Sequence, residues 1–180
     1  MSYEVLESKV TYQGKILKVT VDTLRMPDGN SAVRETVIRG KNAAAVLAVD
    51  NDGKLVFVRQ YRHGFREMLL EIPAGVLEDG EDALTGIKRE LEEETGKIAG
   101  NMEFLFEMYP TVGFCSEKIY VYLATDLTEG VQHFDADEFI EVERYTLEEA
   151  VRMIFDGQIK DSKTIAAILA YQNRILQQKA

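Results

Sequence analysis

Residues 75–96 read GVLEDGEDALTGIKRELEEETG and combine a dense acidic run with regularly spaced apolar residues. At about 100° per residue, the side chains of Leu84, Ile87, Leu91 and Thr95 fall within about 80° of one another. This spacing predicts an amphipathic helix over about residues 82–95. Its apolar stripe is expected to face a hydrophobic core.

The carboxylates of this helix form a separate face. Glu90, Glu93 and Glu94 are centred about 110° from the apolar stripe, and residues three or four positions apart are neighbours on a helix surface. Three such carboxylates repel one another unless a cation lies between them, and hard divalent cations prefer oxygen ligands. Arg89 precedes Glu93 by four residues, so it can brace that carboxylate. The pattern indicates a metal site, and the alternative is an ordinary solvated acidic helix.

The spacing resembles the Nudix box, in which a glycine, five residues, a glutamate and seven residues precede Arg-Glu-hydrophobic-x-Glu-Glu-x-Gly. The matching residues are Gly75, Glu81, Arg89, Glu90, Leu91, Glu93, Glu94 and Gly96, whereas Lys97 occupies the position of the final hydrophobic residue. A solvated acidic helix explains the charges but leaves the fixed spacing of Gly75, Glu81, Arg89 and Gly96 unexplained. The sequence is therefore identified as a member of this family of hydrolases.

The resemblance implies a ligand set for Mg²⁺, with Mn²⁺ as an alternative. Glu90, Glu94 and the backbone carbonyl of Ala74 are expected to bind the metal, and Glu93 joins them or assists. Arg89 and Glu93 belong to the implied catalytic set. The turn around Ala74 suits this role, because a neighbouring proline fixes the approach of the chain and a glycine lets a carbonyl point inward.

The segment from Tyr109 to Lys118, YPTVGFCSEK, resembles a loop of the ADP-ribose pyrophosphatases. That subfamily places a glutamate there to orient or deprotonate the attacking water, and Glu117 matches its position. Gly113 matches the loop glycine and is expected to contact the substrate. Val112 departs from the subfamily, which usually has a proline before this glycine. The alternative for Glu117 is a solvated loop carboxylate.

The strand before the box carries a further resemblance to that subfamily. Arg62 matches an arginine that holds the substrate's phosphates, and a planar guanidinium can give a diphosphate two parallel hydrogen bonds. Arg34 and Glu35 lie where the subfamily's N-terminal strand reaches over the adenine bound by the partner subunit. The alternative for Arg62 is an edge-strand arginine in solvent.

Composition excludes several other functions. The 180-residue chain has a formal net charge of −10, so it lacks the basic surface that nucleic acids and anionic membranes attract. Its one cysteine, Cys115, excludes an intrachain disulfide, and a cytoplasmic location is expected. His63 and His133 have no metal-ligand spacing and are interpreted as surface residues. The acidic run over residues 135–143 is interpreted as a solvated edge.

The order of predicted elements indicates an α+β fold. Strands are expected over residues 3–24 with a break at Gln13-Gly14, and over 33–39, 43–49, 55–62, 104–109, 119–124 and 139–144; helices are expected at 82–95, at 147–155 after a Thr146 cap, and from Ser162 onward. The resemblance implies an αβα sandwich with a mixed sheet. We expect residues 1–40 to form an N-terminal antiparallel hairpin arm and 41–180 the Nudix hydrolase domain.

These observations predict a Mg²⁺-dependent enzyme that hydrolyses ADP-ribose or a related nucleoside diphosphate sugar to AMP and ribose 5-phosphate. The N-terminal arm resembles the swapped arm of the ADP-ribose pyrophosphatases and implies a homodimer, although an arm packed on its own subunit is an alternative. Another nucleoside diphosphate derivative is the competing substrate class, kept open by Val112. A nucleotide-sugar sensor without activity is the remaining alternative, and the intact carboxylate set disfavours it.

Overall fold

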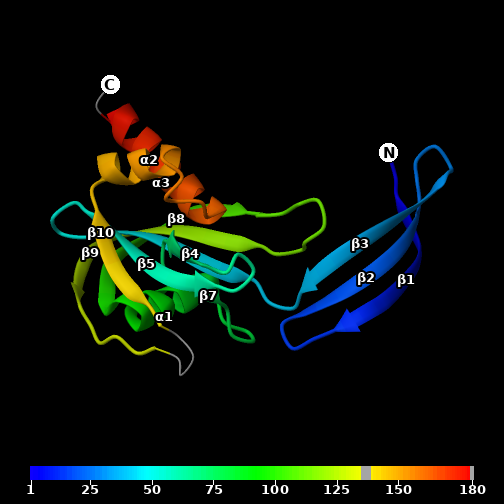
Figure 1. Cartoon of the computed structure of the whole chain (residues 1–180), viewed down its shortest axis with the longest axis horizontal. Coiled ribbons are helices and arrows are strands. Elements are labelled where there is room, and N and C mark those ends of the chain that lie inside the picture. Colours follow the sequence, from blue (N-terminus) through cyan, green and yellow to red (C-terminus); the bar gives the residue numbers. More distant parts are fainter. Residues whose placement is uncertain (135–138, 179–180) are drawn as a thin grey trace. The chain divides into compact units, whose positions relative to one another are not determined.

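The computed structural model describes residues 1–134 and 139–178 (Figure 1). The chain forms two compact units. The first comprises Met1–Asn42 and Tyr109–Lys118, and the second comprises Ala43–Met108 and Ile119–Ala180. The first unit thus combines the N-terminal segment with the loop at 109–118.

The first unit is built on an antiparallel sheet of three strands, β1 (Glu4–Gln13), β2 (Leu17–Arg25) and β3 (Ser31–Arg39), in that spatial order. The turn between β2 and β3 contains Gly29 at φ 85°, a conformation that glycine adopts readily. The loop at 109–118 adds backbone hydrogen bonds to β3, from Val37 N–H to Phe114 O (2.7 Å) and from Ser116 N–H to Val37 O (3.0 Å). The predicted N-terminal arm is therefore a three-stranded sheet.

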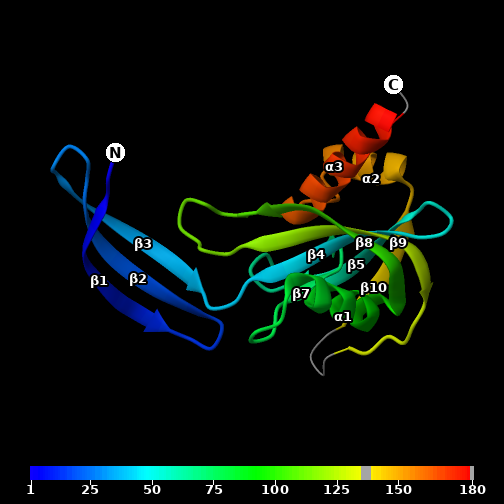
Figure 2. The same ribbon diagram turned by 180° about the vertical axis from the view of Figure 1, so that it is seen from behind.

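The second unit contains a mixed seven-stranded sheet (Figures 1 and 2). Its main path runs β10-β5-β4-β9-β8, with β6 paired to β5 and β7 paired to β4. The strands are β4 (Ala43–Val49), β5 (Leu55–Arg62), β6 (Glu67–Glu71), β7 (Ala74–Val76), β8 (Lys97–Met108), β9 (Ile119–Glu129) and β10 (Glu141–Tyr145). Strands β4 and β9 are parallel, and the other pairs are antiparallel.

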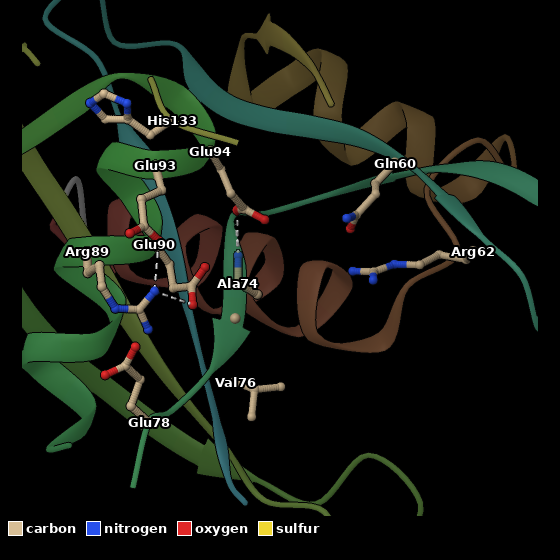
Figure 3. A pocket seen from close by; sticks show the side chains of 11 residues that line it. Gln60, Arg62, Ala74, Val76, Glu78, Arg89, Glu90, Glu93, Glu94 and His133 are labelled. Carbon is tan, nitrogen blue, oxygen red and sulfur yellow. Dashed lines mark hydrogen bonds and ion pairs between the residues drawn. The ribbon is translucent and has the colours of Figure 1, made fainter. Parts of the chain in front are cut away.

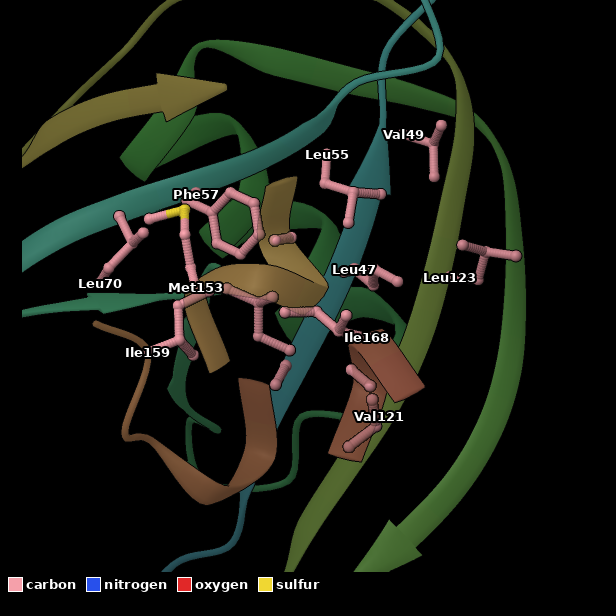
Figure 4. Packing of buried hydrophobic residues seen from close by; sticks show 14 of the residues in the cluster. Leu47, Val49, Leu55, Phe57, Leu70, Val121, Leu123, Met153, Ile159 and Ile168 are labelled. Atoms are coloured by element: carbon pink, nitrogen blue, oxygen red, sulfur yellow. The ribbon is translucent and has the colours of Figure 1, made fainter. Parts of the chain in front are cut away.

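Helices cover both faces of this sheet. Helix α1 (Ala83–Thr95) lies on one face, and α2 (Leu147–Phe155) and α3 (Ser162–Gln178) lie on the other (Figure 2). Because successive strand residues point to opposite faces, β4 supplies Ala44 and Val46 to the α1 side and Leu47 to the other side. The larger cluster, between the sheet and α2 and α3, includes Phe57 and Ile168 (Figure 4). This arrangement confirms the predicted α+β sandwich.

The helix ends follow from local chemistry. Asp82 caps α1 by accepting from the N–H groups of Leu84 and Thr85, and Gly96 ends the helix at φ 66°. Thr146 caps α2 in a reciprocal capping box with Glu149, as its sequence predicts. Helix α3 differs from expectation, because Asp161 rather than Ser162 is the cap and accepts from Thr164 N–H (3.0 Å).

Candidate active site

A pocket of about 420 Å³ opens beside the acidic face of α1 (Figure 3). Its walls come from β5, β7, α1 and the segment after β9. The lining residues are Gln60, Arg62, Ala74, Gly75, Val76, Glu78, Arg89, Glu90, Glu93, Glu94 and His133. Within the second unit, the pocket thus brings together the expected metal ligands with Arg89 and Arg62.

Arg89 contacts three carboxylates around the acidic face of the helix. Its guanidinium donates to Glu90 (2.8 Å), to Glu93 (2.7 Å) and to both oxygens of Glu81 (each 3.2 Å). The hydrogen bonds that Arg89 donates to Glu81 raise the pKa of Arg89 and lower the pKa of Glu81. The predicted bracing of Glu93 by Arg89 is therefore present, and it extends to two further carboxylates.

Gly75 and Glu94 allow the backbone of β7 to lie close to helix α1. A Cβ atom at Gly75 would lie 2.0 Å from the carboxyl carbon of Glu90, so only glycine allows this approach. Glu94 is buried, and its Oε2 accepts from the N–H of Ala74 at 3.0 Å. The backbone of residues 74–75 is thereby held against two of the expected metal ligands.

The donor chemistry of the pocket fits a hard divalent cation. Glu78, Glu90, Glu93 and Glu94 offer only oxygen ligands, which is the ligand type that Mg²⁺ and Ca²⁺ take. Over residues 1–134 and 139–178, however, no three His, Cys, Asp or Glu side chains are grouped so as to hold an ion. Arg89 already binds two of these carboxylates, so metal binding has to compete with its ion pairs.

Arg62 reaches the pocket from the end of β5 (Figure 3). It donates from Nε and Nη2 to the two carboxylate oxygens of Glu71, at 2.6 and 2.8 Å. Burial alone would raise the pKa of Glu71, but the hydrogen bonds from Arg62 and the charge of Lys163 outweigh burial and lower it. Arg62 is thus a pocket cation whose guanidinium is oriented by Glu71, although its side chain is still 40% exposed.

The comparison with protein families covers almost the whole chain. Residues 39–168 match the NUDIX domain, and residues 3–37 match the nucleoside diphosphate sugar hydrolase N-terminal domain. The chain belongs to the Nudix family. The predicted family membership and hydrolase class are therefore confirmed.

Individual relatives agree with this assignment. The chain is 38% identical over 167 residues to a methanol dehydrogenase activator of Bacillus methanolicus, covering 92% of this chain and 90% of that protein. It is 38% identical over 159 residues to an ADP-ribose pyrophosphatase of Bacillus subtilis (strain 168), covering 87% and 85%. A solved structure described as an ADP compounds hydrolase shares the fold, with a TM-score of 0.90, 21% identity, and coverage of 99% and 96%.

The other residues expected to act in this Nudix hydrolase belong to the first unit. Glu117 is ion-paired with Arg39, with Oε1 and Nε 3.3 Å apart, and Gly113 lies in an open part of the same loop. Arg34 and Glu35 lie on β3, opposite Asp22 and Val21 of β2. Their expected roles at the substrate remain predictions.

His133 and Gln60 line the Nudix pocket, although the sequence gave them no role there. His133 is exposed, as the sequence interpretation expected, and its backbone N–H also donates to Glu93 O at 3.0 Å. Gly130 N–H likewise donates to Gly96 O at 2.8 Å, so this segment follows the end of α1. The contacts satisfy helix carbonyls through backbone groups, which leave no signature in the sequence.

Two further sequence interpretations have different outcomes. His63 is exposed beside Tyr61, at a ring distance of 6.3 Å, as a surface histidine should be. In the acidic run, Glu141 is exposed and Glu143 is ion-paired with Arg59, while residues 135–138 lie outside the described residues. None of the helices in the described part of the chain is long and apolar enough to cross a membrane.

Proposed function

We propose that this Nudix hydrolase cleaves the diphosphate bond of ADP-ribose, or of a closely related nucleoside diphosphate sugar, to give AMP and ribose 5-phosphate. The observation that carries the proposal is the pocket itself, which is lined by four glutamates and two arginines. An anionic diphosphate needs cationic partners, and carboxylates alone would repel it. The matched N-terminal family and the ADP-ribose pyrophosphatase relative support the substrate class.

We propose Mg²⁺ as the metal, held by Glu90, Glu94 and the carbonyl of Ala74, with Glu93 assisting and Mn²⁺ as a substitute. When bound, the cation would neutralise phosphate charge and activate a water. Side chains of the protein position the ligands and the phosphate-binding group. Glu94 fixes the backbone at Ala74, Arg89 restrains Glu90 and Glu93, and Arg62 is directed at the phosphates.

In this proposal the remaining roles belong to the first unit. Glu117 orients or deprotonates the attacking water, and Gly113 contacts the substrate. Arg34 and Glu35 reach the adenine bound by a partner subunit in a homodimer. The ion pair with Arg39 restrains the carboxylate of Glu117 within the first unit.

Turnover of a substrate panel tests the proposal. Purified protein is incubated with Mg²⁺ and ADP-ribose, or with nucleoside diphosphate sugars that differ in base and sugar, and a phosphatase then releases phosphate from the products. We expect the highest kcat/KM for ADP-ribose or a close analogue, and no release when a chelator replaces Mg²⁺. Full activity in the chelator would contradict metal dependence, whereas tight binding without turnover would identify a sensor.

A further inference from the structure

The pocket arginine belongs to a group of four charged residues, two of which are buried. The group consists of Arg62, Glu71, Asp161 and Lys163, from β5, β6 and the start of α3. The side chains of Glu71 and Lys163 are only 3% and 9% exposed. Lysine and glutamate are almost never buried so fully unless they are paired, so this group requires an explanation.

Glu71 is shared between two cations. Its carboxylate accepts hydrogen bonds from Nε and Nη2 of Arg62, and its Oε2 also accepts from Nζ of Lys163. Lys163 Nζ donates in addition to Asp161 Oδ2 at 3.0 Å. Lys163, which does not line the pocket, therefore binds the carboxylate that orients Arg62.

The carboxylate of Asp161 is hydrogen-bonded at the start of α3. Asp161 accepts from Thr164 N–H at 3.0 Å and from the Thr164 hydroxyl at 2.6 Å, at the positive end of the helix. The hydroxyl oxygen of Thr164 also accepts from Ile72 N–H at 2.9 Å, two residues before Ala74. This turn of α3 thus supports both the pocket arginine and the backbone that leads to the expected metal ligand.

The sharing of Glu71 also affects the charge near the pocket. An arginine paired with a buried carboxylate is neutral as a pair and attracts an anion weakly. With Lys163 present, the formal charges of Arg62, Glu71, Lys163 and Asp161 sum to zero, and the N-terminus of α3 adds about half a positive charge beside Asp161. Without Lys163 the same group would carry a charge of −1, which would repel an anionic ligand.

We propose that Lys163 is a positioning residue of the active site, which through Glu71 holds Arg62 in place for an anionic diphosphate ligand. The inference rests on the proposed function for the identity of that ligand. Among the described residues Lys163 pairs with Glu71 and Asp161, and of these two Glu71 binds Arg62, so the effect of Lys163 on the ligand is expected to depend on Arg62.

A double-mutant cycle tests this dependence. Binding of ADP-ribose is measured by calorimetry in the presence of a chelator, so that no turnover occurs, for the wild type, Lys163→Met, Arg62→Met and the double variant. We expect Lys163→Met to weaken binding about tenfold in the wild type and by less than about twofold in the Arg62→Met background, since coupled residues are non-additive. Lys163→Arg, which keeps the charge, should recover most of the loss.

Lys160→Met is the matched control. Lys160 lies three residues earlier and pairs with exposed Glu67 at 3.0 Å, so this substitution removes a lysine ion pair outside the group. We expect wild-type binding from this variant. If Lys163→Met weakens binding equally with and without Arg62, Lys163 acts on the fold in general and the proposal is overturned.

A spectroscopic measurement separates failure of the inference from failure of the proposed function. The Nε–H signal of Arg62, assigned by its loss in Arg62→Met, is followed by NMR in the metal-free and ligand-free protein. We expect Lys163→Met to change its chemical shift and speed its exchange with water, while Lys160→Met leaves both unchanged. An unaltered signal in Lys163→Met overturns the inference, even if ADP-ribose is a substrate. A wild type that neither binds nor cleaves ADP-ribose refutes the substrate alone, and the signal still decides the role of Lys163.

Discussion

Single residues set the distance between the acidic helix and the backbone of β7. Gly75 brings the chain so near to Glu90 that a methyl group would overlap the carboxylate. The buried carboxylate of Glu94 accepts a hydrogen bond from the N–H of Ala74. These two contacts give specific reasons why a glycine and a glutamate are needed, and each leads to a prediction.

Gly75→Ala should lower kcat/KM by roughly 10²-fold, because displacement of a ligand by about 1 Å costs that much in an oriented site. The new methyl group has to push the Glu90 carboxylate away. Steady-state hydrolysis and the melting temperature are measured together. Gly64→Ala is the control, since a Cβ at Gly64 meets nothing within 4 Å. Equal kinetics in the two variants would show that the approach to Glu90 is unimportant.

Glu94→Gln should cost orders of magnitude in turnover and leave the fold intact. The amide oxygen can still accept from Ala74 N–H, but the charge offered to a divalent cation is lost. Glu92→Gln is the control, because Glu92 lies on the same helix and does not line the pocket. A melting temperature that falls in step with activity would instead identify Glu94 as a structural residue.

At the scale of elements, the sequence was sufficient to predict an element where the apolar pattern and caps lie within that element. Helix α1 follows from its periodicity, and its observed limits differ by one residue from those expected. Strands β6 and β7 were missed, because they are short, flank Pro73 and depend on pairing with β5 and β4. Strand β8 begins at Lys97 rather than near Phe104, since its exposed edge lacks a regular apolar pattern and its ladder with β9 defines it.

The site shows the same division between local and distant information. The carboxylates of α1 that line the pocket could be predicted from one motif of 22 residues. The contacts of Arg39 with Glu117 and of Lys163 with Glu71 join residues about 80 or 90 positions apart, so no local pattern reports them. His133 is at the surface as expected, but its place beside the pocket was missed, because only the tertiary structure brings its backbone to the end of α1.

The loop at 109–118 carries the prediction that belongs to this scale. If Glu117 is the base, Glu117→Gln should lower kcat by about 10²–10⁴-fold with little change in KM. Raising the Mg²⁺ concentration should not restore activity, whereas a weakened metal site would be partly rescued. Glu107→Gln, on the exposed side of β8 just before the loop, is the control. Wild-type kcat in Glu117→Gln would transfer the role to Glu93.

For the whole molecule, the first unit has too little core of its own. All ten residues of β1 are exposed, including the apolar Val5, Val10 and Tyr12, and Thr20 is the buried residue of β2. A three-stranded sheet needs a covered apolar face for stability, because few strands alone bury little surface. We therefore expect a second copy of the chain to cover this sheet, as the proposed homodimer requires.

Sedimentation equilibrium at micromolar concentration should give about twice the chain mass of 20.4 kDa. Val10→Asp, which adds a charge to the exposed apolar surface of β1, should shift the mass toward that of one chain and lower activity, because Arg34 and Glu35 are proposed to serve the partner's substrate. Phe155→Asp is the control, as Phe155 is an exposed apolar residue at the end of α2 in the second unit. A wild-type mass near 20 kDa would refute the dimer. A dimer that Phe155→Asp dissociates and Val10→Asp leaves intact would place the interface on the second unit, and Arg34 and Glu35 would then lose their proposed role.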